Sequence, residues 1–559
     1  MKYFLKLIII TLIFVTAFNR CANPGRPTGG PKDTIPPILI NAIPVSGTTN
    51  FKDQIIELEF SEYINADKIQ QELIITPKTD IRYKSIVKRN KLILKLDQAL
   101  EDSTTYYFNF ANGVTDITEK NPVVNLALAF STGPFIDSMS VKGSVEELMT
   151  KEPGNGYVVS LYPYSDTLDY FSDSPMYFTT ANDSGNYKLN YIKQGKYRII
   201  SFNDDNSNFM LDPETEAHGF ISDIINLDSA LTLPVMRSVL QNVKPLTLIN
   251  VRPTGRYVEI KFNKQIDSYE LTPEYLQHNI IGENSDIIRL YKPEQINYKD
   301  SLTSYITASD SLGNQILDTL KYVFLESNRK PSGFSYSVPS RIEIENNPLF
   351  VIQFNKPVKS INTDSILIKA DSIFTFYPSV ELDWNKNRTE LNLKLILNKD
   401  SILQAFEASI PKDTAVSDST TQQNQTRTGQ RNLEIVLKKN TFLSVENDTS
   451  SLKTITLQKP HSKPSGTLQL DIQTDKKSFI VQLTDKSGEV KYQRKNEKKI
   501  TLTAIKPDTY QIRVLIDNNE DGKWSYGNLL ENKQPEDVFL YSEEISIREN
   551  WVVEMSITF

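Results

Sequence analysis

The sequence predicts an all-β protein, built as a string of β-sandwiches joined end to end. β-Branched and aromatic residues alternate with polar residues over most of the chain, and turn-forming residues interrupt this alternation about every ten residues. One strand motif recurs at three places in the 559 residues, and a second motif recurs at two. Long stretches with helical periodicity are hard to find. These observations together favour β-sandwiches over any helical architecture.

The first 34 residues predict a targeting segment followed by a tether. Lys2 and Lys6 precede an apolar run from Leu7 to Phe18 that is too short to span a bilayer comfortably, so residues 1–20 resemble a secretory signal peptide. Cys21 follows immediately, at the position where lipoproteins carry an acylated cysteine that binds membrane lipid. Residues 21–34 are rich in Pro and Gly and should form a flexible tether. The alternative is an ordinary secreted protein with one free thiol.

The strand motif predicts three sandwiches. The segments IELEFSEYI, VEIKFNKQI and FVIQFNKPV each alternate up to a Phe, which is followed by Ser or Asn. The Phe should enter a sandwich core, while the small polar residue should turn the end of the strand. We place these sandwiches at residues 35–134, 234–330 and 331–454. The polar stretch 411–432 should be a disordered loop between two strands of the last of them.

The second motif predicts two further sandwiches between and after these. GKYRIISFNDDNSNF aligns with DTYQIRVLIDNNEDG, so that Tyr197 matches Tyr510 and Asp204 matches Asp517. We place the corresponding sandwiches at residues 138–233 and 455–559.

Several segments resemble known families. PPILINAIPVSG, IIELEFSEYI and AFSTG, within residues 35–134, resemble the bacterial Ig-like domain first described in surface-layer proteins, and residues 234–330 and 331–454 keep its strand motif without the opening Pro-Pro. Residues 138–233 and 455–559 resemble transthyretin-like, carboxypeptidase-regulatory sandwiches. The whole chain, from CANPGRPTGGPKDTIPP to DNNEDGKW, resembles lipoproteins of gliding-type Gram-negative bacteria. This resemblance implies an accessory subunit of an envelope machine, such as one for outer-membrane protein assembly or surface lipoprotein export.

The composition argues against several classes of function. The formal net charge of −7 argues against nucleic acid as a partner. The single cysteine and the isolated His218, His278 and His461 argue against zinc sites and Cys/His chemistry. No Gly-x-Ser-x-Gly elbow or phosphate-binding loop is present in the sequence. We therefore expect that the protein is not an enzyme.

One loop near the C-terminus carries half of a calcium-binding pattern. Asp517, Asn519 and Asp521 would take the first, third and fifth positions of an EF-hand-like loop, and the carbonyl of Lys523 the seventh. Asn528 stands at the twelfth position and cannot supply the bidentate carboxylate. Calcium is therefore one interpretation, and a hairpin turn in which Asp and Asn bond their own backbone is the other.

Two further sets of residues are candidates for surface chemistry. Tyr162, Tyr164, Tyr170 and Phe171 should either form an exposed patch that binds glycans or proteins, or line a sandwich core. Asp followed by Ser or Thr, and then by an apolar residue or Thr, recurs along the chain and resembles the O-glycosylation signal of one group of Gram-negative bacteria. The same pairs also start turns. Candidate acceptors are Thr34, Ser103, Thr414 and Ser419.

Two functions follow from these observations. The first is a non-catalytic outer-membrane lipoprotein whose sandwiches form an arm that binds an outer-membrane protein or complex. The alternative is a surface glycan-binding lipoprotein with a calcium-stabilised loop. Residues 22–25, directly after Cys21, lack the acidic residues that surface-exported lipoproteins of these bacteria often carry there, which favours the periplasmic face, although the cell-surface face stays open.

Overall fold

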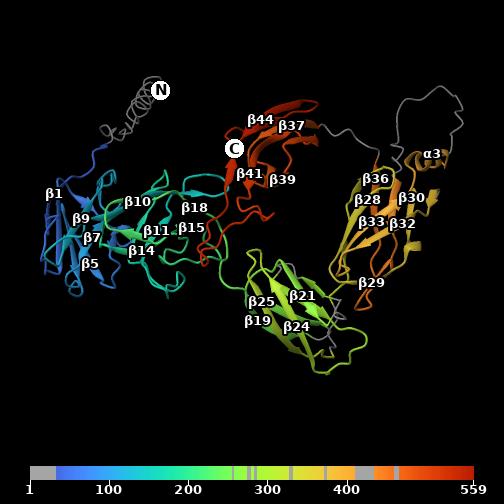
Figure 1. The fold of residues 1–559 in the computed structure, drawn as a ribbon, viewed down its shortest axis with the longest axis horizontal. Helices are drawn as coiled ribbons and strands as arrows, with labels where there is room; N and C mark the ends of the chain where they lie inside the picture. Colours follow the sequence, from blue (N-terminus) through green and yellow to red (C-terminus); the bar gives the residue numbers. More distant parts are fainter. Residues whose placement is uncertain are drawn as a thin grey trace, which may run out of the picture.

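The computed structural model describes residues 33–559 except 255–256, 274–278, 282–285, 327–331, 371–373, 410–432 and 459–464. Within these residues the regular structure is almost entirely β, which confirms the predicted class. Five hydrophobic cores follow one another along the described chain, each between two sheets, and we number the sandwiches one to five in chain order. Figure 1 shows them as successive coloured bodies. None of the helices that the structure describes is long and apolar enough to cross a bilayer.

The first sandwich packs the sheet β1-β2-β6-β5 against the sheet β4-β7-β9, with a small β3-β8 pair at one end. Its elements are β1 (Leu39–Ile43), β2 (Ile55–Phe60), β3 (Ile64–Asn65), α2 (Ile69–Glu72), β4 (Ile74–Thr76), β5 (Tyr83–Lys88), β6 (Lys91–Leu96), β7 (Thr105–Asn109), β8 (Thr115–Asp116) and β9 (Ala127–Ser131).

The third sandwich packs the sheet β19-β20-β23-β22 against β21-β24-β25. Its strands are β19 (Leu248–Pro253), β20 (Tyr257–Phe262), β21 (Ser268–Thr272), β22 (Asn279–Ile281), β23 (Ile287–Tyr291), β24 (Leu302–Ser309) and β25 (Gln315–Tyr322).

The fourth sandwich packs the sheet β26-β28-β33-β32 against β27-β36-β34-β30-β31, with a β29-β35 pair beside them. Its elements are β26 (Tyr336–Ser337), β27 (Arg341–Glu343), β28 (Leu349–Phe354), β29 (Val358–Ile361), η1 (Thr363–Ser365), β30 (Ile366–Ala370), β31 (Phe374–Phe376), β32 (Ser379–Trp384), β33 (Glu390–Ile396), α3 (Lys399–Ser409), β34 (Leu433–Leu437), β35 (Phe442–Ser444) and β36 (Lys453–Gln458).

The recurring Phe and the polar residue after it have the same role in these three sandwiches. Phe60, Phe262 and Phe354 are buried in the cores, as predicted. The polar residue does not simply turn the strand, because its side chain accepts a hydrogen bond from the backbone of the entering chain. The donor and acceptor pairs are Ile38 N and Ser61 Oγ at 3.0 Å, Thr247 N and Asn263 Oδ1 at 2.9 Å, and Ser335 N and Asn355 Oδ1 at 2.9 Å.

The second and fifth sandwiches have the same strand order. In one, β10 pairs antiparallel with β13 and parallel with β17; in the other, β37 pairs antiparallel with β40 and parallel with β44. The opposite sheets are β12-β11-β14-β15 and β39-β38-β41-β42. The strands are β10 (Met139–Glu147), β11 (Val158–Pro163), β12 (Tyr177–Thr180), β13 (Asn186–Ile192), β14 (Gly195–Phe202), β15 (His218–Phe220), β16 (Ile225–Leu227), β17 (Leu231–Thr232) and β18 (Met236–Ser238), then β37 (Gly466–Gln473), β38 (Phe479–Thr484), β39 (Val490–Lys495), β40 (Lys499–Ile505), β41 (Asp508–Ile516), β42 (Val538–Leu540), β43 (Ile545–Ile547) and β44 (Val552–Thr558).

The residues that align in the second sequence motif also make equivalent contacts. The hydroxyl of Tyr197 donates to the carbonyl of Lys193 at 2.7 Å, and that of Tyr510 donates to the carbonyl of Lys506 at 2.9 Å. Asp204 accepts from the backbone N–H five residues later, as does Asp517. Two predicted boundaries need correction, because β18 pairs with β10 beyond residue 233, and β36 pairs with β34 across residue 454.

The fifth sandwich folds back onto the second instead of extending the string. Leu148 of the second sandwich packs with Leu515 and Val538 of the fifth. Arg237 Nη1 donates to Asp537 Oδ1 at 2.5 Å. In Figure 1 the red C-terminal strands accordingly lie beside β18. A further apolar cluster on the second sandwich includes residues of its neighbours, namely Ile74, Leu529 and the partly buried Leu312, so the second sandwich is a packing centre for the first, third and fifth.

Candidate functional site: the first sandwich and its junction with the second

The chain that enters the first sandwich carries a dense row of exposed apolar side chains. β1 is an edge strand, since within the described residues it pairs with β2 and no other strand. Five apolar side chains on and beside it are between 50% and 66% exposed: Ile35, Ile38, Ile40, Ile43 and Val45. An apolar edge strand is a template on which another strand can pair.

The third sandwich contains a counterpart of this strand. β1 and β19 both begin Leu-Ile-Asn, and both pair with the Phe strand through the same shift of register. Of the exposed apolar positions, only Ile40 has an apolar counterpart, Ile249, which is 55% exposed. The other four, Ile35, Ile38, Ile43 and Val45, correspond to Lys244, Thr247, Arg252 and Thr254. The fold therefore does not require an apolar surface here. The matching letters LINAIP and LINVRP are the signal in the sequence that indicates this pair.

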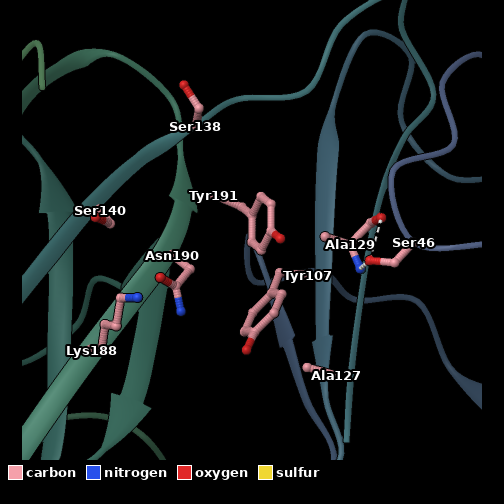
Figure 2. Close-up of a pocket in the computed structure, with 9 residues that line it drawn as sticks. All are labelled: Ser46, Tyr107, Ala127, Ala129, Ser138, Ser140, Lys188, Asn190 and Tyr191. Atoms are coloured by element: carbon pink, nitrogen blue, oxygen red, sulfur yellow. Dashed lines mark hydrogen bonds between the residues drawn. The ribbon is translucent and has the colours of Figure 1, made fainter. Parts of the chain in front are cut away.

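A cleft opens where the first sandwich meets the second (Figure 2). Its volume is about 450 Å³. One wall is the outer face of β7 and β9, and the other is the outer face of β10 and β13. The residues that line it include Tyr107, Ala127, Ala129, Lys188, Asn190 and Tyr191. Ser46, Ser138 and Ser140 complete the lining.

A β-bulge places Tyr191 in this cleft. Along β13 the register shifts from Leu189↔Val141 to Ile192↔Met139, so the strand holds one residue more than β10 does. Tyr191 lies within the bulge with a φ of 57°, and its neighbours Leu189 and Ile192 remain in the core. An alternation without the bulge would turn Tyr191 inward, whereas the bulge points its ring at the first sandwich.

The two tyrosines of the cleft lie against each other across the junction. The rings of Tyr107 and Tyr191 are 5.2 Å apart between centroids and tilted by 32°. The side chain of Asn190 lines the same cleft. Burial raises the pKa of the Tyr107 phenol, and the neighbouring Tyr191 raises it further, although the polar side chain of Asn190 lowers it. The phenol therefore stays neutral at physiological pH and can both donate and accept a hydrogen bond.

The predicted calcium loop is held together by its own backbone. Asp517 is buried, and its Oδ2 accepts from Ser478 Oγ at 2.7 Å and from Gly522 N at 2.9 Å. Burial alone would raise the pKa of Asp517, but these bonds and further loop amides outweigh it and hold the pKa below the ordinary value. Asp517 is thus placed to organise the turn as a carboxylate.

Asn519 and Asp521, two of the other predicted calcium ligands, bond the backbone of their own loop, as expected for a hairpin turn. Asn519 Oδ1 accepts from Asp521 N at 2.9 Å, and Asp521 Oδ1 accepts from Lys523 N at 2.8 Å. Glu536, which lies outside the loop pattern in the sequence, accepts from the N–H groups of Asn518, Asn519 and Ser525. Among the residues that the structure describes, no group of three or more acidic, His or Cys side chains is arranged to hold a metal ion. Calcium binding at this loop stays a prediction.

The predicted aromatic patch is wrong for two of its four residues. Tyr162 and Tyr170 are only 1% and 7% exposed, because neighbouring sandwiches and loops cover this face of the second sandwich. Tyr164 is 38% exposed and Phe171 is partly buried in the same cluster. The four side chains therefore do not form one exposed surface, and the core alternative holds for Tyr162 and Tyr170.

The predicted modification sites are spread along the chain. Thr34 and Ser103 are exposed. Cys21, Thr414 and Ser419, and the predicted disordered loop 411–432, lie outside the described residues. Lipidation and glycosylation at these positions stay predictions.

One segment of the chain matches a known protein family. Residues 33–132 match the family described as the bacterial Ig-like domain, which confirms the resemblance noted for residues 35–134. No curated protein sequence matches the chain.

Solved structures also align with the chain. The major pilin subunit BcpA of Bacillus cereus is 10% identical, with 75% of this chain and 99% of that one covered and a TM-score of 0.12. Domains 1–6 of the surface layer protein SbsC are 9% identical, with 92% and 68% covered and a TM-score of 0.14. SGBP-B of the Bacteroides ovatus mixed-linkage glucan utilization locus, solved with a mixed-linkage heptasaccharide, is 12% identical, with 72% and 94% covered and a TM-score of 0.17. These scores are too low to bear on the function of this chain.

Proposed function

We propose that this protein is a non-catalytic outer-membrane lipoprotein, anchored through Cys21, whose sandwiches form an arm that binds an outer-membrane protein or complex. The observation that carries the proposal is the apolar edge of the first sandwich. Its five exposed apolar residues begin at Ile35, directly after the tether of residues 21–34. A tether of this length reaches at most about 50 Å when extended. A partner embedded in the same membrane is therefore within reach of β1.

The chemistry of the edge favours a protein strand over lipid as its occupant. An edge strand presents backbone N–H and C=O groups that need hydrogen-bond partners. Hydrocarbon cannot supply these bonds, whereas a strand added to the edge supplies both the bonds and the apolar contact. The counterpart β19 keeps the same backbone pairing with Arg252 where β1 has Ile43. The fold therefore does not require the apolar residues of β1, and binding to a partner would explain them. We further propose that this partner is a β-barrel protein of an assembly or export machine.

Photo-crosslinking in membranes tests the proposal with a matched control inside the chain. A photoreactive phenylalanine analogue is placed at Ile40 or, separately, at its counterpart Ile249. We expect a discrete adduct with an outer-membrane protein from position 40 and none from position 249. The proposal fails if position 40 yields no protein adduct, or if both positions yield the same adducts.

A substitution pair tests the same surface without a crosslinker. Ile43→Arg combined with Val45→Thr replaces two exposed apolar residues with Arg and Thr, which stand at the corresponding positions 252 and 254 of the sequence. Pull-down from mild detergent followed by mass spectrometry should recover the partner with the wild-type chain and lose most of it with this variant. Ile249→Thr is the control and should retain the partner. Cys21→Ser should separately move the protein from the membrane fraction to the soluble fraction.

A further inference from the structure

We propose that the cleft between the first and second sandwiches binds a short saccharide that carries a carboxylate, such as an oligomer of uronic acid. This site is separate from the edge strand, and the inference does not depend on the proposed function. Nothing about the ligand is needed for the apolar edge to bind its partner.

The dimensions of the cleft suit a small ligand. Its volume of about 450 Å³ lies within the range of about 300–1,000 Å³ that is usual for ligand sites. Ala127 and Ala129 lie on β9, beside Tyr107 of the neighbouring strand β7. Their small side chains leave space beside the tyrosine ring. Figure 2 shows Tyr107 and Tyr191 between the two walls of this space. The cleft lies at a junction of domains, where binding sites are frequent.

The lining has the chemistry of saccharide recognition. Two aromatic rings offer apolar surface for the C–H groups of a sugar ring, and their hydroxyls offer hydrogen bonds at the edge. The carboxamide of Asn190 adds two donors and an acceptor. A purely apolar ligand would offer no hydrogen bonds to the tyrosine hydroxyls or to the carboxamide of Asn190, at a cost in binding free energy. A polyhydroxylated ring satisfies both kinds of surface.

The charge of the lining indicates an acidic saccharide. Of the described residues that line the cleft, Lys188 is the charged one, and none is acidic. Lys188 lies two residues before Asn190 on the same outward face of β13. An ammonium group beside the sugar-binding surface favours a ligand carboxylate through a charge-assisted hydrogen bond.

The fifth sandwich shows that the fold does not require these side chains. β40 has the same bulge as β13, and Ala504 takes the place of Tyr191 with a φ of 58°. Thr501 and Thr503 stand where Lys188 and Asn190 stand. A non-glycine residue in this left-handed conformation is strained in either copy. Only the second sandwich places a tyrosine there, next to an amide and a lysine.

The test is titration of the detergent-solubilised full-length chain with trigalacturonic acid and with the neutral cellotriose, by calorimetry. We expect trigalacturonic acid to bind with a dissociation constant of about 1 mM or tighter, and cellotriose to bind more weakly. Tyr191→Ala, or Tyr107→Ala, should weaken binding about tenfold, since each removes one ring from the surface. Lys188→Thr should weaken trigalacturonic acid about fivefold while leaving cellotriose unchanged.

Control variants separate the cleft from the rest of the molecule. Tyr305→Ala removes an exposed tyrosine of the third sandwich, and Lys84→Thr removes an exposed lysine of the first; neither should change binding. Hydrogen exchange should show protection by trigalacturonic acid in β7 and β13. Lys188→Thr changes an exposed residue, so it tests the proposal even if a tyrosine variant fails to fold. The inference is overturned if neither saccharide binds, if Lys188→Thr leaves the trigalacturonic acid affinity unchanged, or if protection appears only elsewhere.

Discussion

The first and third sandwiches bury the same Phe, and in both the polar residue after it accepts a hydrogen bond from the entering chain, at Ile38 or Thr247. We call this hydrogen bond the clip. The two sandwiches nevertheless differ in their exposed and in their buried residues. Outside, β1 exposes Ile43 where β19 exposes Arg252. Both strands keep the same register, so register and clip depend on the backbone and on the Phe-Ser or Phe-Asn pair. The exposed residues are free to differ. A difference at such positions therefore indicates a use of the surface and not a need of the fold.

The interiors differ by a buried ion pair. In the third sandwich the buried Lys264 pairs with the buried Asp310, and its Nζ also donates to the carbonyl of Asn242 at 3.0 Å. In the first sandwich Glu62 stands at the position of Lys264, and the buried Phe110 at that of Asp310. The same place in the two sandwiches is thus occupied by a buried charge pair in one and by a buried aromatic ring in the other. Replacing either partner of the pair alone should be costly.

The largest effect is expected for Lys264→Met. It leaves the Asp310 carboxylate buried without its cation and should destabilise the third sandwich by about 3–5 kcal/mol. Glu62→Met, at the matching position of the first sandwich, should change stability by less than about 0.5 kcal/mol. Hydrogen exchange on the full chain, followed in peptides of β20 and β2, measures each sandwich separately. Equal effects in both sandwiches would show that the ion pair does not distinguish them.

Acid should weaken the third sandwich through the same pair. Burial alone would raise the pKa of Asp310, but hydrogen bonds from Lys264 and Asn314 outweigh it and hold the pKa below the ordinary value. A carboxyl whose folded-state pKa is depressed stabilises the fold above its unfolded pKa of about 3.9. That stabilisation is lost as the pH falls below this value towards the folded pKa. Urea unfolding between about pH 6 and pH 3 should show the loss, and the double variant Lys264→Met/Asp310→Leu should reduce it. An unchanged pH profile in the double variant would contradict this assignment.

A smaller effect is expected at the clip. Ser61→Ala removes one hydrogen bond to the entering chain and should cost about 1 kcal/mol. Asn263→Ala removes this bond and a second one, from Nδ2 to the carbonyl of Pro245 at 2.9 Å, so it should cost more. Exchange of the amides of Ile38 and Thr247 reports on the two bonds. If Ser61→Ala costs as much as Asn263→Ala, the second bond contributes nothing.

The smallest effect on stability is expected for the exposed positions. Ile43→Arg with Val45→Thr should change the stability of the first sandwich by no more than about 0.5 kcal/mol, because both side chains are exposed and β19 carries Arg252 at the register position of Ile43. Thermal unfolding and hydrogen exchange measure this. A large destabilisation would mean that the apolar residues of β1 support the fold, which would remove the argument that they serve a partner.

Local patterns in the sequence were sufficient for the all-β class, the Ig-like first domain and the buried Phe of the repeated motif. Strand alternation and turn chemistry depend on neighbouring residues, so a single chain displays them. The same local patterns indicated the match between Asp204 and Asp517, whose loops do make equivalent hydrogen bonds.

The folded chain was needed for the burial of Tyr162, the return of the fifth sandwich to the second, and the cleft between Tyr107 and Tyr191. Each depends on contact between separate sandwiches, as in the bond between Arg237 and Asp537, which are 300 residues apart. An alternating strand looks the same whether its outer face meets water or another sandwich. Which faces meet is decided by packing between domains, and no local pattern records it.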